Sequence, residues 1–337
     1  MRPAASAPLR AAIVTGVTLL APTLAVVPPA HAQVHGERSA VTASDCDEEC
    51  LFGFARRYMD GLVHHDPARV PFGRTVRFTE NDVEMPIGEG LWGTISGAAA
   101  NPLLAADPET GNVAWLGVVY EHGEPAYYAM RLGVRDGRIT EIETVVHRKP
   151  GLPAPFGDPT RLVHDPAFAE VLPPAERRDR ERLRDLANGY FSTVARNDGD
   201  VLTLFDADCQ RIENGMSTTS GRFGSAAVAQ GCEAQFRLGL FRINKRVRER
   251  RFPIIDVKRG VVVATAFFDH DNSFDRYRTT DGKEHSTLLK FPNSLTLMEA
   301  FKIRGGRIYR IEAVFTYVPY FMHSPWAQGG AGEDRDE

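Results

Sequence analysis

The feature that most constrains this chain is a strand-like stretch that occurs twice. GRITEIETVV at residues 137–146 returns as GRIYRIEAVF at residues 306–315. Six of the ten positions are identical, and the offset between the copies is 169 residues (306 minus 137). A single sheet has no need of the same strand twice, so the repeat predicts that a whole folding unit is duplicated.

A helix-like stretch and a short strand pair are duplicated as well. FARRYMDGLVHHDP (54–67) has its counterpart in LANGYFSTVARNDG (186–199), and each predicted helix carries a tyrosine, Tyr58 or Tyr190. TVRFTENDVE (75–84) matches DCQRIENGMS (208–217) at an offset of 133 (208 minus 75). Because the offset later grows to 169, the second copy holds 36 additional residues (169 minus 133).

Turn signals complete each copy. Residues 112–147 read as long antiparallel strands with a hairpin turn at Asp136-Gly137, and the second copy turns at Gly305-Gly306. Within the additional residues, 227–251 has helical periodicity and ends before Pro253, while 260–270 predicts a buried strand. Each copy thus predicts an α+β unit of one helix, a short strand pair and long antiparallel strands.

A proline-rich stretch joins the two copies. Residues 148–176 contain too many prolines for a long helix or a central strand, so they predict a linker or wrapping segment. Pro173-Pro174 is expected to open the second helix, where proline is tolerated. We expect domains at 46–148 and 176–326, a linker at 149–175 and a disordered tail at 327–337.

The first 32 residues have the pattern of a secretory signal peptide. Arg2 and Arg10 give a positive start before the apolar run at 11–27, and AHA at 30–32 predicts cleavage after Ala32, hence a secreted protein. Cleavage removes two arginines, so the net charge changes from −4 to −6. This balance gives no electrostatic basis for binding nucleic acid, and no later stretch is apolar enough for a membrane span. The basic run NKRVRERR at 244–251 suits a solvated helix face.

The four cysteines fit an oxidising compartment. Cys46 and Cys50 are four positions apart at the edge of a predicted helix, and Cys209 and Cys232 bracket a loop of 22 residues. Three pairings are possible in principle. We predict the local one, Cys46 with Cys50 and Cys209 with Cys232, and no CxxC spacing indicates a metal site.

The order of elements resembles the cystatin-like α+β fold of the nuclear-transport-factor-2-like superfamily. That superfamily includes SnoaL-type polyketide cyclases, ketosteroid isomerase and scytalone dehydratase. CDEECLFGFARRYMDGLVHHDPARVPFGRTVRFTENDVEMPIGEGLWGT (46–94) and RFPIIDVKRGVVVATAFFDH (251–270) are similar to an exported microbial family of tandem SnoaL-like domains of unknown function. The resemblance implies two cone-shaped domains, each with a long N-terminal helix packed on a curved antiparallel sheet.

The resemblance also implies an apolar cavity with a few inward-pointing acids, histidines or tyrosines. Burial moves the pKa of such groups toward neutrality, which suits acid–base chemistry without a metal or organic cofactor. We therefore expect a cofactor-independent lyase, isomerase or hydrolase that acts on a small organic or sugar-derived molecule. The alternative is a non-catalytic module that binds a small ligand or associates with protein, for example as a homodimer through sheet faces.

In the first copy, strand alternation places Glu143 on one face with Ile139 and Val145, which makes it a candidate base. Tyr58 in the predicted helix and His65 at its exit are candidates for the same site, as are Glu80 and Trp92. The sequence around His65 equally fits a helix-ending turn capped by Asp66, and Tyr58 equally fits core packing.

The second copy has the more polar cluster, and we expect it to be the active one. Asp269 and His270 emerge from an apolar strand in FFDHD, and an aspartate that orients a histidine base is a recurring arrangement. Neighbours on a strand point to opposite faces, so only one of the two can face the cavity. Arg211 and Glu213, on an early strand, are expected to line the same cavity.

Further candidates in the second copy have structural alternatives. Glu312 replaces Glu143 at the repeat offset, but Arg310 nearby offers an ion pair instead. Asp269, Asp271 and His285 would be the ligands of a divalent cation, although their spacing matches no recognised metal motif. The aromatic residues near the C-terminus fit either a lid or packing between the domains; they are Tyr317, Tyr320 and Trp326.

Overall fold

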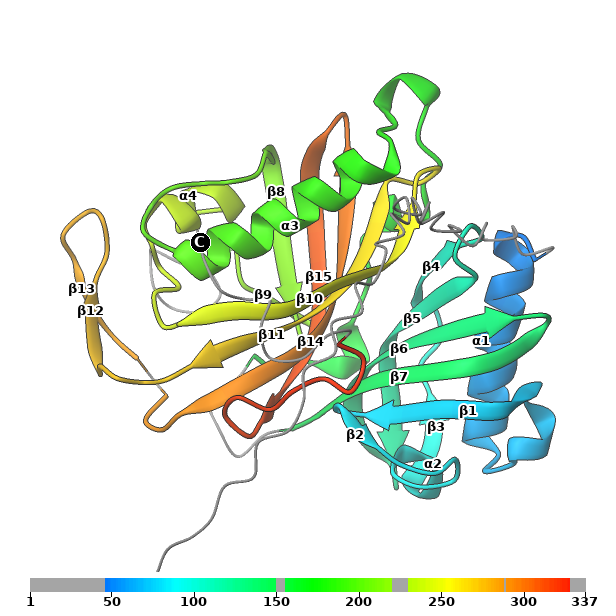
Figure 1. Ribbon diagram of the computed structural model, residues 1–337. Helices are drawn as coiled ribbons and strands as arrows, with labels where there is room; N and C mark the ends of the chain where they lie inside the picture. Colours follow the sequence, from blue (N-terminus) through cyan, green and yellow to red (C-terminus); the bar gives the residue numbers. More distant parts are fainter. Residues whose placement is uncertain (1–45, 150–154, 220–229, 288, 328–337) are drawn as a thin grey trace, which may run out of the picture. The chain divides into compact units, whose positions relative to one another are not determined.

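The computed structural model describes residues 46–149, 155–219, 230–287 and 289–327. These residues form an α+β structure with two sheet-rich bodies (Figure 1). The first body consists of α1 and a seven-stranded sheet, and the second of α3, α4 and a six-stranded sheet. The predicted signal peptide and the predicted tail from residue 328 onward lie outside the described residues.

The first sheet is mixed. Its strand order is β2-β1-β7-β6-β5-β3, β4 pairs with β5, and β1 runs parallel to β7 while the other pairs are antiparallel. The elements of this body are α1 (Glu48–Val63), the 3-10 turn η1 (Pro67–Arg69), β1 (Phe72–Glu80), β2 (Val83–Glu84), α2 (Leu91–Thr94), β3 (Ile95–Ala98), β4 (Leu103–Asp107), β5 (Asn112–Glu121), β6 (Glu124–Arg135) and β7 (Arg138–Arg148).

The second sheet repeats this plan in the order β10-β11-β14-β15-β8-β9, with β8 parallel to β15. A two-stranded hairpin, β12 and β13, projects beside it (Figure 1). The elements are α3 (Arg180–Arg196), β8 (Phe205–Glu213), β9 (Met216–Ser217), α4 (Cys232–Arg237), β10 (Arg246–Asp256), β11 (Val261–His270), β12 (Arg276–Arg278), β13 (Glu284–Ser286), β14 (Asn293–Arg304) and β15 (Arg307–Val318).

Both long helices begin at an aspartate and bury one apolar stripe. The Asp47 carboxylate accepts from Cys50 N at 3.0 Å, and the Asp179 carboxylate accepts from Arg182 N at 2.7 Å, which satisfies otherwise unpaired N–H groups. Tyr58 of α1 and Tyr190 of α3 lie in the apolar clusters that these helices form with one face of their own sheets. Figure 1 shows α3 lying across the second sheet. We call this helix-covered side the inner face of each sheet.

The predicted hairpins and disulfides are confirmed. Asp136 and Gly137 join β6 to β7, Gly305 and Gly306 join β14 to β15, and all four have positive φ. Two successive residues with positive φ produce the tight turn that matches the twist of paired strands, which is why these residue types stand there. Cys46 is bonded to Cys50 and Cys209 to Cys232.

Two local predictions are wrong. Residues 246–251 belong to strand β10 rather than to a helix, and in this part of the chain only Cys232–Arg237 is α-helical among the described residues. Pro253 lies inside β10, where it is tolerated because β10 is the edge strand of its sheet. Pro173-Pro174 opens only a 3-10 turn, η4 (Pro174–Glu176), while α3 starts after its cap at Asp179.

The outer faces of the two sheets pack against each other inside one compact unit of the chain. Their shared apolar cluster contains Val145 and Val314, which are repeat counterparts at the offset of 169. His147 Nδ1 lies 3.4 Å from the hydroxyl of Thr316, which is its counterpart at the same offset. Equivalent residues therefore meet across this contact, as they do at a two-fold axis.

The proline-rich stretch and the C-terminal residues both pack on the bodies. From 155 to 176 the chain forms three 3-10 turns, η2 (Pro159–Arg161), η3 (Pro166–Ala169) and η4, and Phe168 is buried in the cluster between the sheets. Trp326 donates its indole N–H to Thr79 Oγ1 at 2.9 Å and packs against Arg131. In the described part of the chain, no helix is both long and apolar enough to cross a membrane.

The Cys209–Cys232 disulfide is expected to be the more stabilising of the two. Replacing both residues with serine should lower the free energy of unfolding by about 3 kcal/mol, because the unfolded chain regains the freedom of a 22-residue loop. Urea unfolding measures this loss. The matched control replaces Cys46 and Cys50, which close a much smaller loop and should cost less; an equal or larger loss in the control would contradict the prediction.

Candidate functional site

Glu143 lies on the outer face of the first sheet, between the two bodies. Arg131 Nε donates to it at 2.8 Å, and Arg251 of the second body donates to its other oxygen. Burial raises the pKa of this carboxyl, but the charges of Arg251 and Arg131 outweigh burial and lower it. The expectation that Ile139 shares this face is wrong: the register shifts at Thr140, and Ile139 joins the inner cluster. Glu143 is therefore an ion-paired group at the contact between the bodies.

Asp269 is fully buried on the outer face of the second sheet. Both of its oxygens accept from Arg248, at 2.9 and 3.1 Å, and Ser294 donates a further hydrogen bond at 2.5 Å. The Arg248 guanidinium also lies 4.6 Å from the centre of the Phe267 ring. Three hydrogen bonds therefore engage both oxygens of this buried carboxylate, which argues for a structural role.

His270, the neighbour of Asp269, points to the opposite face of the sheet. Nδ1 lies 3.0 Å from Asn293 Oδ1 and Nε2 lies 2.7 Å from Asn244 Oδ1, so both ring nitrogens are engaged. Burial lowers the pKa of His270. Asp269 therefore does not orient His270, and the two do not form the dyad that the sequence suggested.

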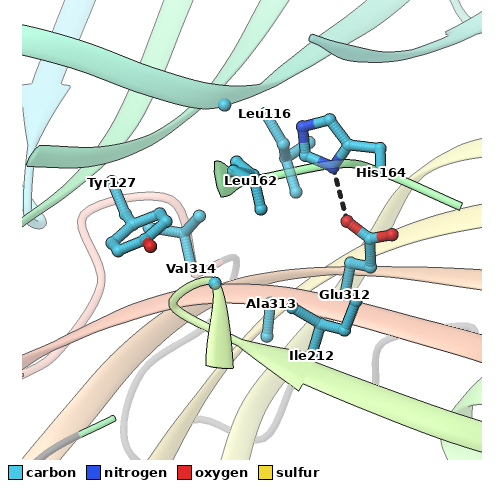
Figure 2. Close-up of a pocket in the computed structure, with 10 residues that line it drawn as sticks. Leu116, Tyr127, Leu162, His164, Ile212, Glu312, Ala313 and Val314 are labelled. Carbon is cyan, nitrogen blue, oxygen red and sulfur yellow. Dashed lines mark hydrogen bonds and ion pairs between the residues drawn. The ribbon is translucent and has the colours of Figure 1, made fainter. Parts of the chain in front are cut away.

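Glu312 lines a small pocket between the sheets with Tyr127 and His164 (Figure 2). Glu312 Oε2 lies 2.5 Å from His164 Nδ1, and Oε1 accepts from Asp165 N at 3.0 Å. Arg310 pairs with Asp165 and not with Glu312, contrary to the alternative considered from the sequence. The pocket volume is about 20 Å³, which is room for about one water molecule and too little for an organic substrate.

The candidates of the first body gather around α2, where His65 Nδ1 lies 2.5 Å from Trp92 O, and each is engaged by a neighbour. Tyr58 is buried on the inner face, where its ring meets the edge of Trp92 at 5.6 Å and burial raises the pKa of its hydroxyl. Both oxygens of Glu80 are engaged, by Leu91 N at 2.8 Å and by Arg148 at 3.1 Å. His65 is exposed at the exit of α1, and the next residue, Asp66, caps η1 as the turn alternative requires.

The inner face of the second body carries a buried polar cluster, which is the candidate site. Arg211 and Glu213 stand on β8, as the sequence suggested, and the structure adds Glu299 from β14 and Tyr190 from α3. The Tyr190 hydroxyl hydrogen-bonds to the Glu299 carboxyl. Arg211 Nη2 donates to Gln235 Oε1 of α4 at 2.8 Å. Arg211 and Glu299 are 1% and 2% exposed, so both ionisable groups are removed from water.

Burial strongly raises the pKa of Glu299. Burial and the nearby negative charge of Glu213 raise the pKa of Glu299 to about 8, against the opposing influence of Arg211 and Tyr190. Glu299 Oε2 has no hydrogen-bond partner among the described residues. At neutral pH the cluster therefore holds a carboxylic acid rather than a carboxylate, and one of its oxygens is unused.

The first body lacks this cluster at the equivalent positions. Glu299 pairs across the sheet with Ala264 and Ala313, whereas its counterpart Met130 pairs with Trp115 and Thr144. Arg211 has its counterpart in Phe78 at the offset of 133, and Phe78 belongs to the apolar inner cluster. The two inner faces thus share a backbone plan but differ in chemistry: at these positions the second carries Glu299 and Arg211, where the first carries Met130 and Phe78.

The cation site considered from the sequence is not assembled. In the described ranges no cluster of three or more His, Cys, Asp or Glu side chains could hold a metal ion. Asp269 forms an ion pair with Arg248, and Asp271 Oδ2 lies 3.4 Å from Lys245 Nζ. The ring of His285 stacks on the ring of Tyr277.

Sequence reasoning missed Glu299 and His164. Glu299 is the only acid in the apolar stretch SLTLMEAF, and its repeat counterpart is a methionine. That contrast was visible in the aligned repeat and marks a polar group on a core-facing position. His164 carries no comparable signal, since its position within a proline-rich stretch says nothing of its contact with Glu312.

A known protein family matches part of this chain. Residues 176–315 match a domain of unknown function (DUF8021), which corresponds to most of the second body and to less than half of the chain. No curated protein matches the chain.

Several solved structures resemble parts of the chain. A protein from Sphaerobacter thermophilus is 18% identical over 29% of this chain and 96% of its own, with a TM-score of 0.23. A de novo designed protein with a curved β-sheet is 15% identical over 41% of this chain and 88% of its own, with a TM-score of 0.26. AusH from Aspergillus nidulans is 15% identical over 41% of this chain and 86% of its own, with a TM-score of 0.27. At such scores these likenesses support no conclusion about function.

Glu299 should make stability depend on pH. Its pKa is raised from 4.5 to about 8 in the folded chain, so between these values the folded state holds a proton that the unfolded state has lost. The stabilisation is complete below pH 4.5 and is lost as the pH rises to about 8, with a slope of up to about 1.4 kcal/mol per pH unit. Glu299→Gln should remove this part of the slope in urea unfolding at pH 5 to 8, and an unchanged slope would contradict the assignment.

Asp269 should behave as a structural residue. Asp269→Asn should lower the free energy of unfolding by about 3–5 kcal/mol, because the buried Arg248 loses its bidentate partner and keeps the ion pair with Glu249. The double variant Arg248→Met with Asp269→Leu removes both charges and should recover most of this loss. Chemical denaturation of the three proteins measures the effect, and a single variant as stable as the wild type would refute the role.

Proposed function

We propose that the second body is the working half of a cofactor-independent lyase, isomerase or hydrolase. Its substrate would be a small, partly apolar organic or sugar-derived molecule, and its acid–base groups would be Glu299 and Glu213. One observation carries the proposal: a fully buried carboxyl group with an unused oxygen lies beside a second carboxyl group and a buried arginine. A buried carboxyl group whose pKa is strongly raised is typical of acid–base sites.

The proposed division of roles follows from charge. Glu299 is protonated at neutral pH because its pKa is raised to about 8, so it would act as the acid and donate to a substrate oxygen. Glu213 supplies the negative charge that helps to raise this pKa and is the less buried of the two, so it would act as the base. The proton taken from the substrate would move to Glu213, and the bonding electrons would move toward the oxygen that Glu299 holds.

The fold and location proposed from the sequence are compatible with this role. We propose that each body is a SnoaL-like domain with a cone-shaped interior, at 46–148 and 176–326. In support, α1 and α3 each share an apolar cluster with one face of their own sheet. We also propose that the protein is secreted after cleavage at Ala32; two disulfides are typical of chains that fold in an oxidising compartment.

The second candidate function is association without catalysis. It is favoured by the packed outer faces, where repeat counterparts such as His147 and Thr316 meet. These faces are the ones expected to form a homodimer, and they are already covered within the chain. We therefore propose that the two bodies associate with each other within one chain, and that the first body supports the second.

Hydrogen–deuterium exchange into candidate substrates tests catalysis even while the reaction is unidentified. The purified protein would be incubated in D₂O with ketones, β-hydroxy acids, lactones, epoxides and sugar derivatives, and NMR would detect exchange or conversion. We expect activity on at least one class and a loss of about 100-fold or more in kcat/KM for Glu299→Gln. Glu312→Gln is the matched control and should retain activity. Full activity of Glu299→Gln, or no turnover of any class, would favour the association function.

A further inference from the structure

Two buried polar atoms of the candidate site lack partners among the described residues: Arg211 Nε and Glu299 Oε2. An unsatisfied buried polar group costs about 1–3 kcal/mol, so folded proteins rarely retain one without a reason. Here two such atoms belong to one cluster on the inner face of the second sheet, and each would gain a partner from a ligand oxygen that reached it.

The orientation of Arg211 is fixed by its surroundings. Nη2 donates to Gln235 Oε1 at 2.8 Å, and Gln235 is held in turn because its Nε2 donates to Thr218 O at 2.8 Å. The guanidinium group rests on the rings of Phe241 and Phe236, with its central carbon 4.5 and 5.2 Å from the ring centres. Glu213 Oε1 is 3.8 Å from Nε, which is too far for a hydrogen bond.

The groups around Glu299 define the charge that a ligand would meet. Tyr190 faces it from α3, and Arg211 and Glu213 face it from β8. The adjacent strands β11 and β15 place only alanines beside it, Ala264 and Ala313. The positive charge of Arg211 and the negative charge of Glu213 cancel. At neutral pH Glu299 itself is uncharged because its pKa is raised to about 8.

A site of this composition distinguishes between ligand classes. Arg211 Nε–H is a donor, and the protonated Glu299 carboxyl group is a second donor, so both call for an acceptor oxygen. A carboxylate ligand would bring a negative charge next to Glu213 and among aromatic rings, where the charge of Arg211 is already balanced. A ketone, aldehyde or lactone oxygen accepts two hydrogen bonds without that cost.

We propose that the second body binds uncharged carbonyl compounds, with the carbonyl oxygen held between Arg211 Nε and the Glu299 carboxyl group. The inference deepens the proposed function at the same site and rests on it for the identity of the acid. The first body has Phe78 and Met130 at the equivalent positions and offers neither donor there. Of the two described bodies, the second alone therefore carries this carbonyl site.

Binding of matched ligand pairs to the full chain tests this inference without reference to turnover. The probes are acetone, cyclohexanone and acetophenone, each labelled with ¹³C at the carbonyl, and the corresponding carboxylates acetate, cyclohexanecarboxylate and benzoate. We expect at least one ketone to bind with a downfield shift of its carbonyl resonance and more tightly than its carboxylate. Tighter binding of the carboxylates, or no binding of any ketone, would overturn the proposal.

Variants assign the two donors. Arg211→Met should weaken ketone binding about tenfold or more, and Arg211→Lys is the second variant if the first does not fold. Wild-type binding should weaken above about pH 8, where Glu299 ionises, whereas Glu299→Gln keeps a donor and should lose this pH dependence. Met130→Leu, at the counterpart of Glu299 in the first body, should bind as the wild type does. Unchanged binding in both Arg211 variants would refute the site.

The outcomes also separate this inference from the proposed function. Ketone binding that depends on Arg211, without exchange or conversion of any compound, would retain the carbonyl site and reject catalysis. Turnover that depends on Glu299 but concerns only charged acids would retain catalysis and reject the carbonyl site.

Discussion

The packing of the two outer sheet faces against each other is the contact on which the rest of the structure depends. Val145 and Val314 are repeat counterparts and belong to the same buried cluster, and His147 meets its own counterpart Thr316. The contact therefore has the geometry of an isologous dimer, although one chain supplies both halves. Central strands are covered on both sides as a result, and β14 is buried over all but its last residue.

This contact also explains the fate of several acids. Glu143, Asp269 and Glu312 are buried on the outer faces, so each needs a hydrogen-bonding or ion-pairing neighbour. Glu143 pairs with Arg131 and Arg251. Asp269 pairs with Arg248, and Glu312 pairs with His164. An acidic group in an apolar strand is a reasonable candidate for a base, but the same burial that would raise its pKa also selects an ion pair whenever an arginine is within reach.

While the outer faces pack against each other, the inner faces of the two bodies differ in chemistry. The first inner face is filled by large apolar side chains, including Trp115 and Met130. The second replaces these two by Ala264 and Glu299, and replaces Phe78 by Arg211. A duplicated unit can accept such a change in one copy because the other copy still supplies the supporting face.

Local features were determined by the sequence alone. Asp136-Gly137 and Gly305-Gly306 specify hairpins because these residues tolerate positive φ, and the disulfides join cysteines that are close along the chain. Of the candidate site, Arg211 and Glu213 were predicted, while Glu299 required the register between strands. Strand alternation establishes which residues share a face, yet a single bulge at Thr140 separates Ile139 from Glu143.

Only the tertiary structure decided which face of each strand meets its helix and which meets the other body. Residues 246–251 form an edge strand because β11 offers unpaired backbone groups there, and no local pattern records that partner. The pairing of Glu143 with Arg251 spans 108 residues. Contacts at such distances depend on how two complete sheets pack, and this packing is a property of the whole fold and not of any short stretch of sequence.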